Sequence, residues 1–140
     1  MCGIVGAIGS VDCSEMLLNS LKRLEYRGYD SSGIVTSHNG NFNLRRSVGK
    51  IANLEQSVRK DRLSGSIGLG HTRWATHGKV SEQNAHPHVA SNRVAIVHNG
   101  IIENYKVIKS RLESKGYVVS TETDSEVLAH LFVEAFDSGL

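Results

Sequence analysis

Short apolar runs interrupted by glycine constrain the fold of this sequence more than any other feature. Residues 2–9 read CGIVGAIG, and a second glycine-rich run spans residues 66–72. A strand accommodates glycine where another backbone approaches closely, whereas glycine weakens a helix, so each run predicts a buried β-strand. The cysteine at position 2 therefore stands at the start of a strand.

The segments between and after these runs predict helices and further strands. Asp12 and Glu15 have the spacing of a capping box, and leucines follow at helical intervals as far as Gly28. Further helices are expected over residues 51–58, 104–116 and 123–135. Further strands are expected over residues 33–36, 42–44, 93–98 and 117–120. Asn39 and Gly40 predict a hairpin turn, and helices mixed with hairpins favour an α+β fold over a purely parallel sheet.

Composition limits the kind of partner and the redox setting. The chain has 140 residues, 39% of them hydrophobic, and a formal charge of +2 with no block of like charges. One globular domain is therefore expected, with a small-molecule partner rather than a nucleic acid or a membrane surface. Two cysteines without a secretory signal or a long apolar span predict a reducing, cytoplasmic setting and no disulfide bond.

Cys2 is a candidate nucleophile because removal of Met1 would leave a thiol and a free α-amine on one residue. The amine, with a pKa of about 7.7–8.0, can accept the proton of a thiol whose pKa is about 8.5, so no histidine is required. A small second side chain favours removal of the initiator methionine. The alternative is an ordinary buried cysteine at the start of a strand, since free cysteine is among the most buried residue types.

The segment GHTRWATHG, residues 70–78, is expected to form a loop where a strand ends. Arg73 offers a planar pair of donors that suits a carboxylate, and Thr76 and His77 add a hydroxyl and an imidazole. Trp74 supplies a large apolar wall. The alternative is a surface loop in which a cation rests on an aromatic face.

Two later segments carry further polar groups suited to binding. In HNGIIENY, residues 98–105, the Asn99 amide and the Gly100 N–H can converge on one oxygen and form an oxyanion hole. Asn-Gly in isolation is, alternatively, typical of a tight turn. Asp124 lies in the first turn of an expected helix, where a carboxylate either interacts with the helix dipole or binds a ligand ammonium group.

Five of the seven histidines lie between residues 71 and 98, which raises the alternative of a zinc-dependent hydrolase. His86 and His88, in an extended segment, could form a pair of zinc ligands. A zinc site needs three or four ligands, and no acidic or thiol side chain stands nearby at a matching spacing. Structural hydrogen bonding explains these histidines better, and neither a metal nor another cofactor is expected.

Together, these groups suit an amino acid with a reactive side-chain carbonyl, and glutamine fits best. The segments MCGIVG, LEYRGYDSSG, HTRWATHG, NAHPH, HNGIIENY and ETDSE, in this order, resemble the N-terminal glutaminase domain of the glutamine:fructose-6-phosphate aminotransferase (isomerizing) family. The resemblance implies an N-terminal-nucleophile hydrolase fold, which is an αββα sandwich with antiparallel sheets. It also implies hydrolysis of the L-glutamine amide, with the ammonia used to convert fructose 6-phosphate to glucosamine 6-phosphate.

The resemblance further implies a role for each matching residue. Cys2 corresponds to the nucleophile, and Asn99 with Gly100 corresponds to the oxyanion hole. The residues implied in substrate binding are Arg73 and Thr76 for the α-carboxylate, Asp124 for the α-ammonium group, and His77 as part of the pocket wall. Trp74 resembles the family's gate to an ammonia channel, and Arg27 resembles a residue that supports the nucleophile.

The sequence departs from the family's pattern in being short. We expect residues 1–140 to be the N-terminal part of a glutaminase domain, incomplete at its C-terminus and without the sugar-phosphate isomerase domains. Fructose 6-phosphate would then bind only through the absent domains of a full-length enzyme, which the family implies to be a homo-oligomer. A non-catalytic fragment that binds glutamine without hydrolysing it is the alternative function.

Overall fold

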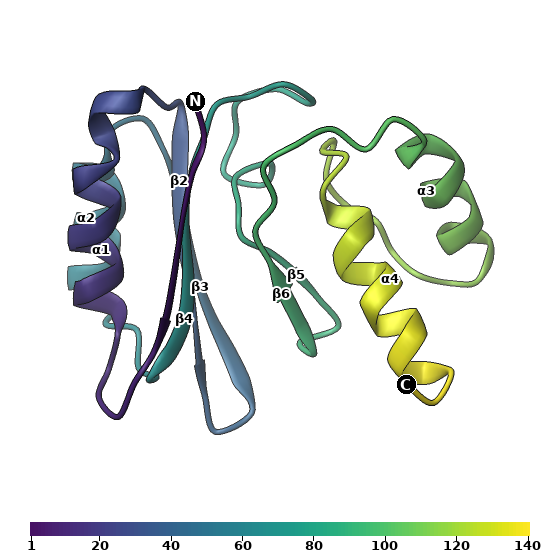
Figure 1. Cartoon of the computed structure of the whole chain (residues 1–140), viewed down its shortest axis with the longest axis horizontal. Helices are drawn as coiled ribbons and strands as arrows, with labels where there is room; N and C mark the ends of the chain where they lie inside the picture. The colour runs from purple at the N-terminus through teal and green to yellow at the C-terminus, as the bar shows by residue number, and fades with distance from the viewer.

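The computed structural model describes residues 1–140, which fold into four layers (Figure 1). Helices α1 (Ser14–Arg23) and α2 (Ile51–Lys60) cover one face of a four-stranded sheet. A two-stranded sheet lies on the other side, and helices α3 (Tyr105–Ser114) and α4 (Glu126–Asp137) form the fourth layer. None of these helices has the length and hydrophobicity that crossing a membrane requires.

The larger sheet is antiparallel throughout, as predicted. Its strands are β1 (Gly3–Ile8), β2 (Ser31–His38), β3 (Asn41–Val48) and β4 (Ile67–Arg73), in the order β1-β4-β2-β3. Asn39 and Gly40 have φ angles of 50° and 76°, the left-handed conformations that a two-residue hairpin turn requires. Gly3 pairs with Thr72, so the residue that precedes β1 lies beside the end of β4.

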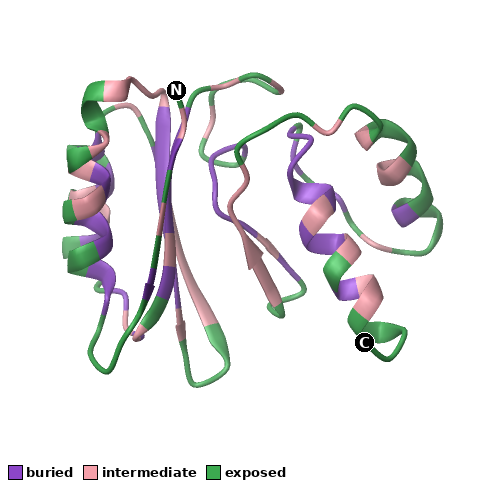
Figure 2. Ribbon diagram, in the orientation of Figure 1, coloured by how far each residue is buried: buried purple, intermediate pink, exposed green.

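The principal core lies between this sheet and helices α1 and α2. The apolar positions at helical spacing face the sheet, and Leu17, Leu21 and Leu54 are fully buried. Figure 2 shows the buried stripe along both helices. A Cβ atom on Gly68 would lie 2.7 Å from Leu17 Cδ1, so glycine in β4 allows α1 to approach closely. Close approach was the reason for predicting a strand here.

The smaller sheet consists of β5 (His88–Ala90) and β6 (Val94–Ile96), which pair in antiparallel fashion. Helix α4 packs on it through Ala129 and Val133, which form an apolar cluster with Ala90. A third cluster joins α3 to α4 through Leu112 and Val127. The outer helices are therefore held by two small clusters, separate from the principal core.

Several strand and helix predictions differ from the structure. Helix α1 ends at Arg23 rather than at Gly28, and the first part of the expected loop, residues 70–73, belongs to β4. Residues 117–120 form no strand, because Val119 packs into the cluster between α3 and α4 instead of pairing with a sheet. The strand expected over 93–98 is reduced to β6, and its partner β5 is too short to show a periodicity in the sequence. Cys13 rather than Asp12 caps α1, since the Asp12 carboxylate accepts a hydrogen bond from the Gly65 N–H at 2.8 Å.

Candidate active site

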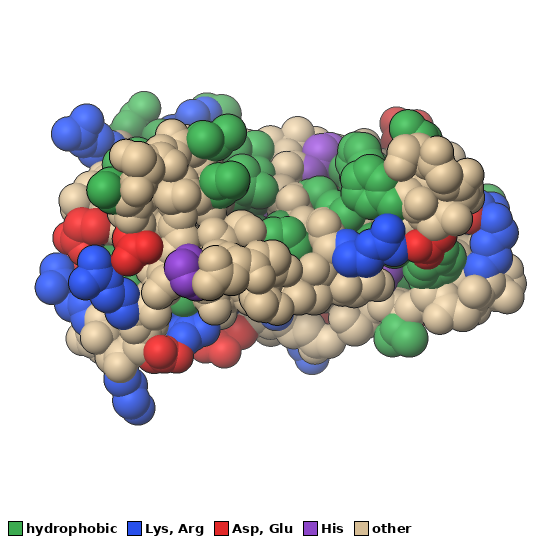
Figure 3. Space-filling model, turned by 90° about the horizontal axis from the view of Figure 1, so that it is seen from below, with side chains coloured by type: hydrophobic (Ala, Val, Ile, Leu, Met, Phe, Trp, Pro, Cys, Tyr) green, Lys and Arg blue, Asp and Glu red, His purple; other side chains and the backbone are tan.

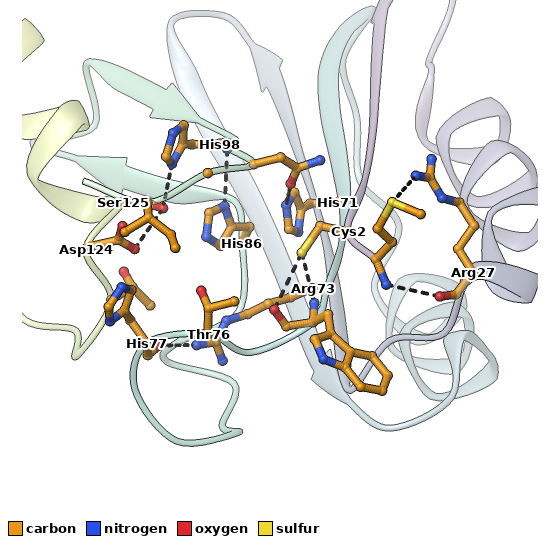
Figure 4. A pocket seen from close by; sticks show the side chains of 16 residues that line it. Cys2, Arg27, His71, Arg73, Thr76, His77, His86, His98, Asp124 and Ser125 are labelled. Atoms are coloured by element: carbon orange, nitrogen blue, oxygen red, sulfur yellow. Dashed lines mark hydrogen bonds between the residues drawn. The ribbon is translucent and has the colours of Figure 1, made fainter. Parts of the chain in front are cut away.

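A cavity of about 420 Å³ opens where the start of β1, the end of β4 and the segment before α4 meet (Figure 4). Sixteen residues line it. They include every site residue predicted from the sequence, namely Cys2, Arg27, Arg73, Trp74, Thr76, His77, Asn99, Gly100 and Asp124. They also include residues that the sequence did not single out for the site, among them His71, His98 and Ser125.

Cys2 lies immediately before β1 and is half-buried. Its Sγ atom accepts a hydrogen bond from the Trp74 N–H at 3.1 Å. The next residue is packed tightly: the Gly3 N–H donates to Thr72 Oγ1 at 2.9 Å, and a Cβ on Gly3 would lie 2.7 Å from Leu24 Cδ1. This packing fixes the start of the strand and holds the thiol at the cavity.

The first residue also lines the cavity. The Met1 amine donates to the Arg27 carbonyl at 3.1 Å, and the Arg27 guanidinium donates to the Met1 sulfur at 2.9 Å. Arg27 belongs to the 3-10 helix η1 (Glu25–Arg27), which follows α1. The side chain implied to support the nucleophile thus contacts the residue whose removal would expose the Cys2 amine.

Arg73 ends β4 and is buried, with 4% of its surface exposed. Its guanidinium donates to the backbone carbonyls of His77, Gly78 and Lys79. These bonds fold back the loop that carries Thr76 and His77, a role that the sequence did not indicate. Arginine has five N–H groups, so the loop contacts leave donors for a ligand.

Asp30 is a structural residue of the site that sequence reasoning missed. Its carboxylate accepts a hydrogen bond from the Ala75 N–H at 2.7 Å and so adds a second anchor for the loop that Arg73 folds back. Asp30 lies in the motif LEYRGYDSSG, and this position could have pointed to it, but only Arg27 of that segment was predicted as a site residue. Trp74, in the same loop, is 54% exposed, consistent with a position at the rim of the cavity.

Asn99 and Gly100 follow β6 and enter the cavity from the smaller sheet. Asn99 Oδ1 lies 2.7 Å from His71 Nε2. A Cβ atom on Gly100 would lie 2.9 Å from His98 Nε2, so the backbone passes close to this ring. The two predicted oxyanion donors therefore stand together at the lining.

Asp124 lies before α4 and is buried, with 3% of its surface exposed. Its Oδ2 atom accepts a hydrogen bond from the Ile102 N–H at 2.6 Å. The Ser125 hydroxyl lies 3.5 Å from Asp124 Oδ1 and 3.0 Å from His98 Nδ1. On the same side of the view in Figure 4 lies His77, whose Nε2 atom is buried without a hydrogen-bond partner.

Three histidine rings pack together at the cavity: His71 and His86, which line it, are stacked, and His88 is tilted against His86. The ring centroids of His71 and His86 are 4.2 Å apart, and those of His86 and His88 are 4.4 Å apart. Burial lowers the pKa of all three, to about 4 for His71 and about 3 for His88, so the rings are neutral near pH 7. No three histidine, cysteine or acidic side chains are grouped so that they could hold a metal ion. Ring packing and hydrogen bonds, such as that of His88 with Thr123, are the contacts that these rings make.

Comparison with known proteins assigns this chain to a protein family. Residues 43–139 match the family model described as a glutamine amidotransferase domain. The chain belongs to the glutamine amidotransferases. It is 56% identical, over its whole length, to glutamine–fructose-6-phosphate aminotransferase [isomerizing] of Bartonella quintana, of which it covers 23%. It is 54% identical to the enzyme of the same name from Acinetobacter baylyi, over 96% of this chain and 22% of that protein.

Solved amidotransferase structures share the fold. The glutamine phosphoribosylpyrophosphate amidotransferase from B. subtilis, complexed with ADP and GMP, superposes with a TM-score of 0.77 at 28% identity. The match covers 95% of this chain and 29% of that chain. The predicted α+β sandwich of an N-terminal-nucleophile amidotransferase is therefore confirmed.

Proposed function

We propose that this protein hydrolyses the side-chain amide of L-glutamine with Cys2 as the nucleophile. The observation that carries the proposal is the convergence of Cys2, Asn99 and Asp124 on one cavity in a member of the glutamine amidotransferases. These side chains offer a thiol, an amide donor and a carboxylate. They match the carbonyl carbon, the carbonyl oxygen and the α-ammonium group of glutamine.

The reaction follows from these groups. After removal of Met1, the Cys2 amine takes the thiol proton while the sulfur attacks the amide carbon. The Asn99 amide and the Gly100 N–H donate to the oxygen of the tetrahedral intermediate. The C–N bond then breaks, the amine passes its proton to the leaving nitrogen, and ammonia departs. Water attacks the thioester, giving one proton to the amine, and glutamate leaves as the thiol is restored.

The remaining lining residues orient the substrate in this proposal. Arg73 and Thr76 bind the α-carboxylate, Asp124 binds the α-ammonium group, and His77 forms part of the wall. The burial of Asp124 supports its part, because a charged ligand group would replace lost hydration there. The exposed Trp74 ring acts as the gate of the cavity, and Arg27 supports the chain start.

We further propose that residues 1–140 are the glutaminase part of a longer cytoplasmic enzyme. The chain spans less than a quarter of the curated relatives it matches, and their name includes fructose 6-phosphate. The ammonia released here would serve the conversion of fructose 6-phosphate to glucosamine 6-phosphate. Binding of the sugar phosphate and homo-oligomer formation would then belong to the rest of that enzyme.

The proposal is tested by the intact mass of the chain before and after exposure to an electrophilic glutamine analogue. We expect loss of Met1, a single adduct, and release of glutamate from glutamine. Cys2→Ala should abolish both adduct and hydrolysis while the fold remains. Cys13→Ala is the matched control, because Cys13 is buried outside the cavity, and it should behave like the wild type.

Other outcomes separate the alternatives. A processed chain that binds glutamine but forms no adduct and releases no glutamate would favour the non-catalytic fragment. Hydrolysis that persists in Cys2→Ala would contradict the nucleophile outright. If that remaining hydrolysis depended on stoichiometric zinc, the histidine-based hydrolase would replace the proposal.

A further inference from the structure

The orientation of the Asn99 amide decides whether it can assist the reaction. An asparagine side chain has a carbonyl oxygen on one side and an NH₂ group on the other. Only the NH₂ group stabilises a developing oxyanion, whereas the carbonyl oxygen in its place would repel the negative charge. Some neighbouring group must therefore select one of the two orientations.

His71 is the neighbour that contacts this amide. Its Nε2 atom lies 2.7 Å from Asn99 Oδ1. The ring is 1% exposed, projects from β4, and stacks on His86 with an interplanar angle of 18°. A ring held by a strand and by a stacked partner cannot follow a rotating amide, so it presents a fixed hydrogen-bonding atom to Asn99.

The polarity of the contact follows from the two ring nitrogens. Burial lowers the pKa of His71 to about 4, so near pH 7 the ring carries a single N–H. A bare Nε2 at 2.7 Å from a carbonyl oxygen would set two lone pairs against each other. The Nδ1 atom is buried and has no hydrogen-bond partner, whereas Nε2 faces an acceptor oxygen at bonding distance. The backbone of His98 also lies near the ring and favours its protonated form, but less than Asn99 does. The proton therefore resides on Nε2, which donates to Asn99 Oδ1.

We propose that His71 is a positioning residue that holds the Asn99 carbonyl away from the cavity and so directs its NH₂ group towards the substrate oxygen. This inference rests on the proposed hydrolysis of glutamine, to which it adds a source of order for the oxyanion hole. His71 acts through Asn99 in this scheme. The histidine stack thereby connects the larger sheet to the donor that follows β6.

Two variants of the same residue test the donor directly. In His71→Gln the side-chain NH₂ can donate in place of Nε2–H. In His71→Leu an apolar side chain fills the space of the ring and the donor is lost. We expect His71→Leu to lower kcat for glutamine hydrolysis about 10²-fold, the typical effect of losing one oxyanion donor, with KM changed less than about threefold. His71→Gln should restore kcat to within about tenfold of the wild type.

Two ligands distinguish loss of Asn99 positioning from general disruption of the cavity: one resembles the ground state and the other the tetrahedral intermediate. The aldehyde analogue of glutamine forms a tetrahedral adduct with the thiol, so its affinity should fall in His71→Leu together with kcat. The affinity for glutamate should remain unchanged. His130→Leu is the control, because His130 is 5% exposed and lies outside the cavity lining. It should lose stability without losing kcat. Equal losses of kcat in His71→Gln and His71→Leu would overturn the inference.

A measurement without turnover keeps the two proposals distinguishable. Nitrogen-15 NMR of the imidazole rings tells a protonated nitrogen from a bare one, and the His71 signals are assigned by their absence in His71→Gln. We expect a proton on Nε2. A proton on Nδ1 would refute the role of His71 while leaving the Cys2 chemistry intact. Conversely, hydrolysis by Cys2→Ala would remove the proposed function and leave the Nε2 proton as observed.

Discussion

At the scale of single residues, the buried histidines make the free energy of unfolding depend on pH. His71, His86 and His88 are each less than 5% exposed. Burial lowers the pKa of His71 to about 4 and that of His88 to about 3, against about 6.5 for histidine in an unfolded chain. The hydrogen bonds that these rings make, such as that of His88 with Thr123 at 3.1 Å, do not offset the cost of charging them.

We expect the free energy of unfolding to fall as the pH is lowered from about 6.5 towards 4.5. In this window the unfolded chain takes up protons that the folded chain does not, so each buried histidine contributes up to about 1.4 kcal/mol per pH unit. Urea unfolding across the window measures the slope. His88→Gln should flatten it, and His38→Gln should not, because His38 is exposed. A stability that stays constant down to pH 4.5 would contradict the expectation.

At the scale of elements, secondary structure was predicted correctly where it depends on neighbouring residues in the chain. It was predicted wrongly where contacts with distant residues determine it. Leucine spacing identified α1, and Asn39 with Gly40 identified the hairpin, because both are local properties. Residues 117–120 look like a strand, yet contacts with α3 and α4 decide otherwise. The predicted residues that line the cavity were named from local motifs and from the family resemblance. Their hydrogen-bond partners Asp30 and His71 were missed, because hydrogen bonds between residues far apart in the chain produce no regular spacing in the sequence.

The close approach of β2 to the segment that carries His86 gives a prediction at this scale. A Cβ atom on Gly33 would lie 2.1 Å from the His86 carbonyl oxygen, which is backbone and cannot move aside cheaply. Gly33→Ala should therefore push the two layers apart and lower the free energy of unfolding by about 1–3 kcal/mol or more. Thermal or urea denaturation measures it.

Gly6→Ala is the matched control for this substitution. Gly6 lies in β1, where an added Cβ would meet only Leu69 Cδ2 at 3.7 Å, an ordinary contact distance. Its stability should stay within about 0.5 kcal/mol of the wild type. Equal effects of the two substitutions would show that loss of glycine flexibility, and not the approach of the layers, sets the cost.

At the scale of the whole molecule, the two faces of the larger sheet differ in how well they are covered. Ala7 faces the helices and belongs to the core, so by alternation Ile4 and Ile8 face the other side. Ile8 is 86% exposed, and its direct partner Ile67 is 50% exposed. Elsewhere on the surface, basic and acidic side chains are interspersed, as the face in Figure 3 shows. An apolar edge of this kind promotes self-association.

We expect Ile8→Thr to raise the protein concentration at which aggregation begins, while the free energy of unfolding changes by less than about 0.5 kcal/mol. Light scattering against concentration measures the first quantity and urea denaturation the second. Ile34→Thr is the contrast, because Ile34 is fully buried in β2 and should lose about 1–3 kcal/mol. Unchanged light scattering in Ile8→Thr would show that association uses another surface.

The position of Met1 and Cys2 at the cavity lining has a practical consequence for preparing this protein. In the proposed mechanism, an affinity tag fused ahead of residue 1 would prevent removal of Met1 and keep the Cys2 nitrogen in a peptide bond, where it cannot accept a proton. We expect such a preparation to be inactive in an assay of glutamine hydrolysis even when its fold is intact. Leu140 is 90% exposed and lies at the end of α4, in a different layer from the chain start beside the larger sheet (Figure 1). A tag placed there leaves the thiol and its amine free.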